Sequence, residues 1–213
     1  MKKFLVIGKP INHSYSPKLH NFWFKKNNIK AVYDKKLIEP SEIKTLIDQI
    51  RINEITGINV TVPYKQEVIN YLDILSPEAD ITSSVNTIYK EENRVVGHNT
   101  DIAGFELAIR HTKFDIVNKN ILIIGAGGVV PSIIFSLRKM GVKEINVMNR
   151  TENKLNILKN KFKNINIVPW KKNFNFDMVI NATSLGLNEK DKLNIDFNNI
   201  EPGKFFYDLI YNP

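Results

Sequence analysis

The sequence has 213 residues, enough for one large domain or two domains of modest size. Hydrophobic residues make up 43%, which supports a real core. No run approaches the roughly 20 uninterrupted apolar residues that a membrane-spanning helix needs. The chain has no cysteine, which excludes disulfides and thiolate chemistry and favours a cytoplasmic protein. The net charge of +8 comes from lysines scattered along the chain, so we expect no nucleic-acid partner and a field that steers small anionic substrates.

Predicted strands and helices alternate along the chain, which is typical of an α/β protein with parallel strands and helices on both faces. Strands are expected at residues 4–7, 31–38, 58–62, 85–89, 95–98, 121–124, 144–148, 165–168, 178–182 and 205–209. Helices are expected at residues 17–27, 40–50, 65–72, 101–112, 129–140 and 152–162, with a further helix starting at Ser76 and Pro77.

A polar stretch at residues 113–119 divides this series in two. We therefore predict two α/β domains, residues 1–100 and residues 101–213. The helix at residues 101–112 would link them through a broad apolar face. That predicted face consists of Ile102, Phe105, Leu107, Ala108 and Ile109.

The segment around Lys65 is the first candidate for chemistry. Val60 and Val62 read as the end of a buried strand, which Pro63 stops because it has no N–H to donate. Thr61 points opposite to the valines, and Lys65 follows at the start of a helix. Ligands of open α/β sheets bind beyond the carboxyl ends of strands, where a lysine partly shielded from water can exchange protons near neutral pH. The alternative is an ordinary solvated lysine.

Two further loops place polar groups at element ends. Ser14 and Ser16 lie in the loop that leaves the first strand, suited to a hydroxylated or carboxylated ligand, although Ser16 could simply cap a helix. Asn86 and Asp101 add an amide and a carboxylate. His13 is left out, because a lone histidine is more often structural.

A glycine turn follows the apolar strand at residues 121–124. Glycines there let the backbone approach a pyrophosphate, and the next helix offers free N–H groups. Val130 occupies the third glycine position of the dinucleotide fingerprint, so a purely structural turn stays open as an alternative. The residues of the turn are Gly125, Ala126, Gly127 and Gly128.

The next strand ends without the carboxylate that would accept a hydrogen bond from a free ribose hydroxyl. Arg150, Thr151 and Lys154 follow instead and make a phosphate-sized cluster of donors. This favours NADP over NAD. Thr151 could also cap the helix that begins beside it.

Taken together and in order, eight segments of the chain resemble shikimate dehydrogenase. They are residues 8–17, 59–65, 85–87, 99–101, 125–128, 149–151, 181–186 and 207–211. The resemblance covers essentially the whole chain. It implies an N-terminal open α/β substrate-binding domain and a Rossmann-like, doubly wound dinucleotide-binding domain with a cleft between them. The implied reaction is the reversible NADPH-dependent reduction of 3-dehydroshikimate to shikimate, in the pathway to chorismate and the aromatic amino acids.

The resemblance also implies the site residues. Lys65 would be the acid–base residue with Asp101 beside it, and no metal is implied. The other substrate contacts would be Ser14, Ser16, Thr61, Asn86 and Tyr211. The NADP contacts would be Gly125, Ala126, Gly127, Gly128, Val129, Asn149, Arg150, Thr151, Lys154, Thr183 and Leu209.

Two departures from the family pattern and two alternatives remain. Ile102 stands where many relatives have glycine, which we expect to be neutral. The chain stops at Pro213, where the family continues with a helical region that supplies a glutamine to the substrate site. We expect a partial chain, or else a pocket closed differently. The alternatives are a quinate or dual quinate/shikimate dehydrogenase and a non-catalytic dinucleotide-binding regulator, and the chain would act as a monomer or a homodimer.

Overall fold

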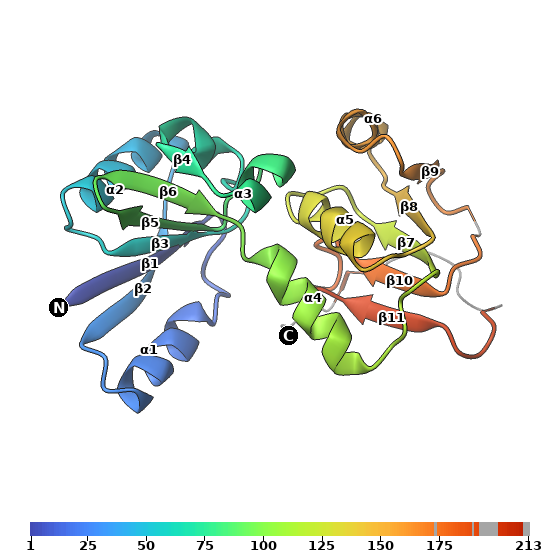
Figure 1. The fold of residues 1–213 in the computed structure, drawn as a ribbon, viewed down its shortest axis with the longest axis horizontal. Helices are drawn as coiled ribbons and strands as arrows, with labels where there is room; N and C mark the ends of the chain where they lie inside the picture. The colour runs from blue at the N-terminus through green and yellow to red at the C-terminus, as the bar shows by residue number, and fades with distance from the viewer. Residues whose placement is uncertain (173, 189, 192–199, 211–213) are drawn as a thin grey trace. The chain divides into compact units, whose positions relative to one another are not determined.

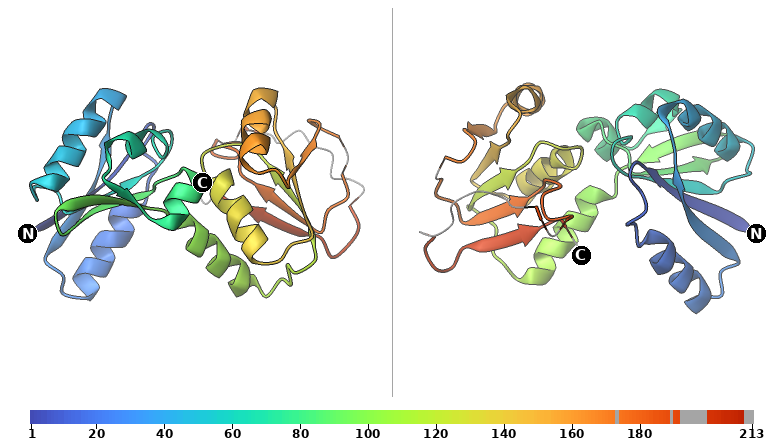
Figure 2. Two further views of the ribbon diagram at one scale, coloured as in Figure 1. Left: turned by 45° about the horizontal axis from the view of Figure 1, so that its top comes forward. Right: turned by 180° about the vertical axis from the view of Figure 1, so that it is seen from behind.

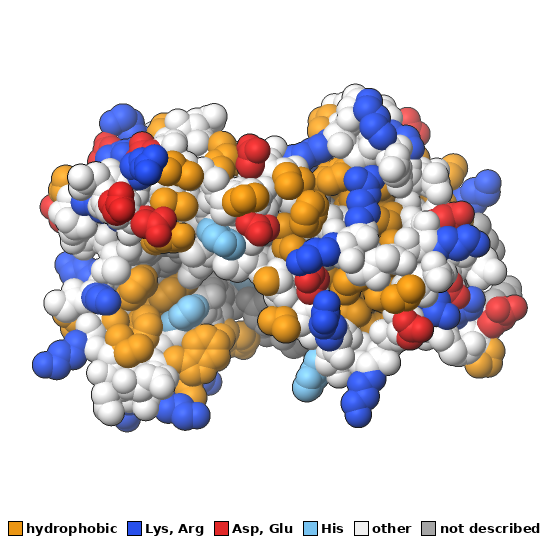
Figure 3. All heavy atoms as spheres, viewed as in Figure 1, with side chains coloured by type: hydrophobic (Ala, Val, Ile, Leu, Met, Phe, Trp, Pro, Cys, Tyr) orange, Lys and Arg blue, Asp and Glu red, His pale blue; other side chains and the backbone are white. Residues whose placement is uncertain are grey.

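The chain divides into two α/β units, Met1–Asp101 and Ile102–Pro213. The structure is a computed structural model that describes residues 1–172, 174–188, 190–191 and 200–210 (Figure 1). Over those residues, no helix is both long enough and apolar enough to cross a membrane. Lys and Arg side chains are spread over the face seen in Figure 3 and do not gather in one patch.

The first unit is built on a six-stranded mixed sheet with the strand order β2-β1-β3-β5-β6-β4. Strands β2, β1 and β3 run parallel, whereas β5 is antiparallel to both β3 and β6. The carboxyl ends of β1, β3 and β6 therefore meet the amino end of β5 at one edge. The strands are β1 (Lys2–Gly8), β2 (Ala31–Leu37), β3 (Gly57–Val60), β4 (Ile74–Leu75), β5 (Thr87–Glu91) and β6 (Arg94–His98).

Helices lie on both faces of this sheet, α1 on one and α2 on the other (Figures 1 and 2). The apolar stripe of α2, which contains Ile43, Leu46, Ile47 and Ile50, is buried in the larger core of the unit. Ser76 caps α3 as predicted, because its Oγ accepts from the N–H of Ala79 at 3.2 Å. The helical segments are α1 (Ser16–Lys26), η1 (Pro40–Glu42), α2 (Ile43–Arg51), η2 (Glu67–Tyr71) and α3 (Pro77–Thr82).

The second unit has a five-stranded parallel sheet with the order β11-β10-β7-β8-β9. Its central strand β7 has almost no polar residue, as a strand covered on both faces requires. The strands are β7 (Asn120–Ile124), β8 (Glu144–Met148), β9 (Asn166–Val168), β10 (Met178–Asn181) and β11 (Phe205–Asp208). All the carboxyl ends lie at the same edge, which confirms the predicted Rossmann-like arrangement.

Three helices pack into the core on one face of this second sheet, while side chains of a connecting segment, among them Trp170, Phe174 and Phe176, cover the other. The helices are α4 (Asp101–Thr112), α5 (Val130–Lys139) and α6 (Glu152–Lys161). Their bounds agree with the predicted helices to within a residue.

Three local predictions around Lys65 and in α4 were wrong. Strand β3 ends at Val60, so Val62 lies past it and is 59% exposed instead of buried. Lys65 lies in a turn that leads into the short 3₁₀ helix η2, not in an α-helix. In α4, Leu107 is 68% exposed and Glu106 is buried in its place. Residues at spacings of three, four and seven share a helix face, so Glu106 lines up with Ile102 and Leu107 does not.

Candidate active site

Lys65 and Asp101 form the central contact of the first unit. Lys65 Nζ lies 2.6 Å from Asp101 Oδ2, and the two side chains are only 12% and 23% exposed. The backbone of Lys65 is fixed as well, because its carbonyl accepts from the N–H of Val85 at 2.8 Å. The partial burial strengthens this ion pair relative to one on the open surface.

A buried amide positions Asp101 at the start of α4. The N–H of Asp101 donates to Asn99 Oδ1 at 3.0 Å. Asn99 is 1% exposed and donates in turn to Thr82 Oγ1 and to the carbonyl of Ser84. This arrangement satisfies a free N–H of the first helical turn and anchors the carboxylate to the body of the unit.

Asn86 donates a hydrogen bond to the second carboxylate oxygen of Asp101. Its Nδ2 donates to Asp101 Oδ1 at 2.8 Å and to Thr100 Oγ1 at 2.9 Å, while its Oδ1 accepts from the N–H of Thr100. The two oxygens of Asp101 thus have different partners, an ammonium and an amide. In this arrangement the Lys65 ammonium can serve as a proton donor, while the Asp101 carboxylate fixes the direction in which the ammonium points.

Ser14, Ser16 and Thr61 lie at the same edge of the first sheet. Ser14 Oγ accepts from the N–H of Ser16 at 3.3 Å, and the N–H of Thr61 donates to the carbonyl of Ile7. Gly8 leaves room for Thr61, because a Cβ at Gly8 would come within 2.5 Å of the Thr61 methyl. No hydrogen bond among the residues placed by the structure joins these three to the Lys65–Asp101 pair. Tyr211 lies outside the described residues.

Three polar residues that connect to Asn86 through hydrogen bonds were missed by the sequence analysis. Tyr33 OH donates to Asn59 Oδ1 at 2.6 Å, and Asn59 Nδ2 donates to Thr87 Oγ1 at 3.1 Å. Tyr33 is 2% exposed, and this burial raises the pKa of its phenol. A hydrogen bond with Ser16 lowers the same pKa by a smaller amount. The one available signal was Asn59, a polar residue in an otherwise apolar strand.

The predicted dinucleotide turn lies at the carboxyl end of β7. Gly125 has a φ of +119°, and a Cβ there would come within 2.6 Å of the carbonyl oxygen of Ala182. Beyond it, a Cβ at Gly128 would meet nothing within 4 Å, and at Gly127 only that same oxygen, at 3.9 Å. The turn therefore closes against the neighbouring loop at Gly125 and leaves open space beside Gly127 and Gly128. Ala126 and Val129 complete it.

The neighbouring loop is organised by Asn181, the last residue of β10. Asn181 Oδ1 accepts from both the N–H and the hydroxyl of Thr183, and its Nδ2 donates to the carbonyl of Leu185 and to Asp208 Oδ1. The N–H of Leu209 donates to the carbonyl of Asn181 at 3.2 Å. One side chain thus holds Thr183 at the edge where the glycine turn lies, and its backbone holds Leu209 there.

The predicted phosphate cluster lies at the carboxyl end of β8. Asn149 Nδ2 donates to the carbonyl of Thr151 at 2.9 Å. The side chains of Arg150, Thr151 and Lys154 are exposed, and neither cation has an ion-pair partner among the described residues. The Thr151 hydroxyl oxygen accepts no capping hydrogen bond from α6, and its exposed side chain lies beside Arg150 at the start of that helix.

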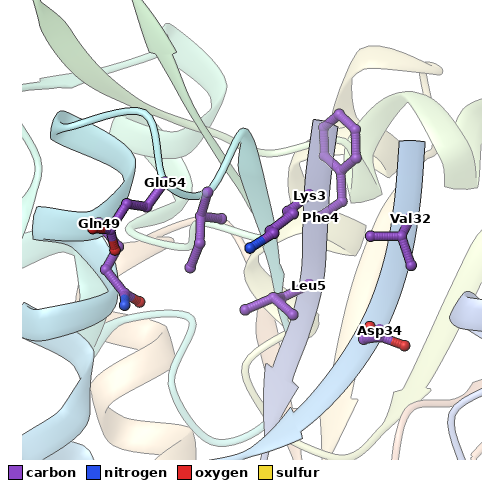
Figure 4. Close-up of a pocket in the computed structure, with 8 residues that line it drawn as sticks. Lys3, Phe4, Leu5, Val32, Asp34, Gln49 and Glu54 are labelled. Atoms are coloured by element: carbon purple, nitrogen blue, oxygen red, sulfur yellow. The ribbon is translucent and has the colours of Figure 1, made fainter. Parts of the chain in front are cut away.

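A hollow of about 340 Å³ lies elsewhere on the first unit, toward the amino ends of β1 and β3 (Figure 4). It is lined by Lys3, Phe4, Leu5, Val32, Asp34, Gln49, Glu54 and Ile55. Ligands of open α/β sheets bind at the opposite, carboxyl edge. The Lys65–Asp101 edge is therefore the better candidate for chemistry.

Two family descriptions match the chain. "Shikimate dehydrogenase substrate binding domain" covers residues 6–88, and "Shikimate / quinate 5-dehydrogenase" covers residues 106–191. A relative named shikimate dehydrogenase (NADP(+)) from Pelagibacter ubique is 54% identical over 212 residues, which is 100% of this chain and 80% of the relative. The chain belongs to the shikimate dehydrogenase family.

Solved structures of shikimate dehydrogenases agree with the fold. The enzyme from Thermus thermophilus, in complex with NADP(H) and shikimate, matches with a TM-score of 0.89 and 30% identity. The enzyme from Aquifex aeolicus matches with a TM-score of 0.90 and 31% identity. Each comparison covers 100% of this chain and 80% of the other. The resemblance to shikimate dehydrogenases noted from the sequence is confirmed.

Proposed function

We propose that this chain catalyses the reversible NADPH-dependent reduction of 3-dehydroshikimate to shikimate. The observation that carries the proposal is the 2.6 Å contact between Lys65 Nζ and Asp101 Oδ2, with Asn86 on the other carboxylate oxygen. The names of the relatives, shikimate dehydrogenase (NADP(+)), support it. On this basis the step belongs to the biosynthesis of chorismate and the aromatic amino acids.

Lys65 acts as the proton donor. Reduction of a ketone leaves negative charge on its oxygen, which needs both a positive neighbour and a proton. The Lys65 ammonium supplies both, and in the reverse direction the neutral Lys65 amine accepts the proton of the substrate hydroxyl. Asp101 holds Lys65 in place and, with Asn86, offers hydrogen bonds to the hydroxyl groups of the ring. Ser14, Ser16, Thr61 and Tyr211 are the remaining proposed substrate contacts.

The residues of the second unit fit NADP. Bound as NADPH, this cofactor supplies the hydride that reduces the ketone carbon. The open space beside Gly127 and Gly128 gives a pyrophosphate room to approach the backbone at the start of α5, where the positive end of the helix dipole favours an anion. The proposed contacts here are Gly125, Ala126, Gly127, Gly128, Val129, Thr183 and Leu209.

Arg150 selects NADP over NAD in this account. Its exposed guanidinium, Lys154 and the exposed hydroxyl of Thr151 suit the three oxygens of a 2′-phosphate. Asn149 shapes the turn that presents them. One charge-assisted hydrogen bond contributes about 1.5–3 kcal/mol, which corresponds to a preference of roughly tens-fold or more.

The two units divide the work. We assign substrate binding to residues 1–100 and NADP binding to residues 101–213, a boundary that falls beside the division between Asp101 and Ile102. The absence of cysteine suits the reducing cytoplasm, where we place the protein as a monomer or a homodimer. Light scattering of the purified chain distinguishes these two states.

The test is steady-state turnover of the purified chain with shikimate and with quinate, each with NADP and with NAD. We expect the highest kcat/KM for shikimate with NADP. Equal efficiency with quinate would make the chain a dual dehydrogenase. NADP binding without turnover of either acid would indicate a non-catalytic dinucleotide-binding protein.

A further inference from the structure

Four hydrogen bonds run head to tail from the core of the first unit to the carboxylate of Asp101. Tyr33 OH donates to Asn59 Oδ1 at 2.6 Å, and Asn59 Nδ2 donates to Thr87 Oγ1 at 3.1 Å. The Thr87 hydroxyl donates to Asn86 Oδ1 at 3.0 Å, and Asn86 Nδ2 donates to Asp101 Oδ1 at 2.8 Å. Asn59, Thr87 and Asn86 each accept from the group before them and donate to the group after them. We call these four residues before Asp101 the amide relay.

The direction of the relay is set by groups that can act in one way only. The backbone carbonyl of Asn86 can only accept, and Asn59 Nδ2 donates to it at 3.2 Å. The amide of Asn59 is thereby oriented with its oxygen toward Tyr33 OH. Thr87 Oγ1 is already an acceptor from Asn59, so its single hydrogen is directed to Asn86.

The orientation of the Asn86 amide decides whether its NH₂ group or its oxygen faces the Asp101 carboxylate. In the arrangement observed, Asn86 Oδ1 receives the hydroxyl of Thr87 and the N–H of Thr100, and its NH₂ faces the carboxylate. Rotated by half a turn, the amide would bring its oxygen against the Asp101 carboxylate and its NH₂ against two donors. The last donor of the relay, the Thr87 hydroxyl, therefore acts together with the Thr100 N–H to stabilise the orientation that leaves Asp101 Oδ2 to Lys65.

The inner end of the relay is held by packing. Tyr33 is 2% exposed, and its ring stacks on His20 with a centroid distance of 4.3 Å and an interplanar angle of 3°. Its backbone is paired with the side chain of Asn21 through both N–H and carbonyl. The phenol hydroxyl therefore has little freedom to follow Asn59 if that side chain moves.

We propose that Tyr33, Asn59 and Thr87 are positioning residues of the reaction, which orient the Asn86 amide toward Asp101 through the amide relay. This inference rests on the proposed function and adds to it three residues that lie behind the substrate contacts. Chains of hydrogen bonds in a low-dielectric interior also polarise one another, so removal of one donor weakens the bonds after it.

The first experiment compares two tyrosines. Tyr33→Phe removes the donor of the relay. Tyr64→Phe is the matched control, because Tyr64 is also 2% exposed and its hydroxyl donates to a backbone carbonyl, that of Ile38, at 2.7 Å. We expect Tyr33→Phe to lower kcat/KM for shikimate by about five- to thirty-fold with an unchanged KM for NADP. We expect Tyr64→Phe to keep kcat/KM within about twofold of wild type even if this variant is destabilised as much as Tyr33→Phe.

The second experiment tests the middle of the relay. Thr87→Val keeps the shape of the side chain and removes the hydroxyl, whereas Thr87→Ser keeps the hydroxyl. We expect a loss with valine similar to that of Tyr33→Phe and recovery to within about threefold of wild type with serine. A loss in Thr87→Ser as large as that in Thr87→Val would contradict the relay, because the hydroxyl would then not be the group that matters.

A readout that does not depend on turnover separates this inference from the proposed function. The side-chain amide resonances of Asn86 should shift in Tyr33→Phe and Thr87→Val and stay at wild-type positions in Tyr64→Phe. Wild-type Asn86 resonances in Tyr33→Phe would overturn the relay, whatever the activity. If the wild-type enzyme is inactive but the Asn86 resonances still shift in Tyr33→Phe and Thr87→Val, the proposed reaction is overturned. The role of the relay in orienting Asn86 would then still hold.

Discussion

Lys65 and Asp101 are 36 residues apart in the sequence, yet Lys65 Nζ lies 2.6 Å from Asp101 Oδ2. The contact exists because β3 and β6 end at the same edge of one sheet, with Lys65 in the turn after β3 and Asp101 three residues after β6. The ammonium and the carboxylate are thus brought together by strand order, and no local motif could do so.

Removal of the ammonium should stop most turnover. We expect Lys65→Ala to lower kcat by about 10²–10⁴-fold, the usual contribution of a positioned proton donor, with a smaller effect on the KM for shikimate. Lys44→Ala is the control, because Lys44 is exposed and paired with Asp48 within α2. Near-wild-type turnover of Lys65→Ala would mean that another group moves the proton.

Arg150 should determine the choice between the two nicotinamide cofactors. In Arg150→Ala we expect kcat/KM with NADP to fall by about tens-fold or more, and kcat/KM with NAD to change little, because only NADP carries the 2′-phosphate. Steady-state kinetics with both cofactors measure this. Arg110→Ala, which removes an exposed arginine of α4, should alter neither. Equal losses with both cofactors would rule out the assigned phosphate contact.

Gly125 should not tolerate a side chain. In Gly125→Ala the new Cβ would meet the carbonyl oxygen of Ala182 at 2.6 Å with φ at +119°, so we expect weaker NADP binding and a lower melting temperature. In Gly104→Ala the Cβ would meet nothing within 4 Å, and α4 should gain about 0.5–1 kcal/mol. Thermal unfolding and cofactor titration of both variants test the contrast. An unchanged NADP affinity in Gly125→Ala would show that this turn is not near the cofactor.

Asp73 should make stability depend on pH. The Arg51 guanidinium beside Asp73, at 2.9 Å between Nη2 and Oδ1, holds the pKa of that carboxyl below its ordinary value, helped by the N–H of Val95. A lowered folded-state pKa stabilises the fold above the unfolded value of about 3.9, and this contribution is lost as the pH falls through the folded value.

Asp73→Asn should therefore lower the free energy of unfolding by about 1 kcal/mol at neutral pH, and the difference from wild type should shrink as the pH falls below about 3.9 and through the folded-state pKa of Asp73. Urea unfolding across this range measures it. Asp34→Asn, which changes an exposed carboxylate with no ion-pair partner among the described residues, serves as the control. A difference between Asp73→Asn and wild type that does not depend on pH would contradict the role given to the ion pair.

The sequence predicted the long elements well because their apolar periodicity reflects burial. The strand at residues 144–148 and the helix at residues 101–112 have the predicted bounds. The sequence-based predictions failed where a residue far away in the chain decides whether a side chain is buried or a strand forms. Glu106 is buried because Lys139 of α5 reaches it at 3.1 Å, and β4 is a two-residue strand that depends on pairing with β6.

Of the site, the sequence predicted the residues at the ends of strands, where polar side chains interrupt an apolar pattern. The contact between Lys65 and Asp101 and the glycine turn at the end of β7 lie at the edges predicted for them. The amide relay could not be predicted, since Tyr33 reads as an ordinary core residue of β2 and only its hydroxyl connects it to Asn59.

The most direct test of the account is a double-mutant cycle on kcat with Lys65→Met, Asp101→Asn and the double variant. If the ammonium and the carboxylate act as one unit in the proton transfer, the double variant should have a kcat no lower than that of Lys65→Met alone, because Asp101 then has no ammonium to orient and its hydrogen bonds to the ring affect mainly the KM for shikimate. Losses that multiply in the double variant would contradict the account, since the two residues would then contribute independently.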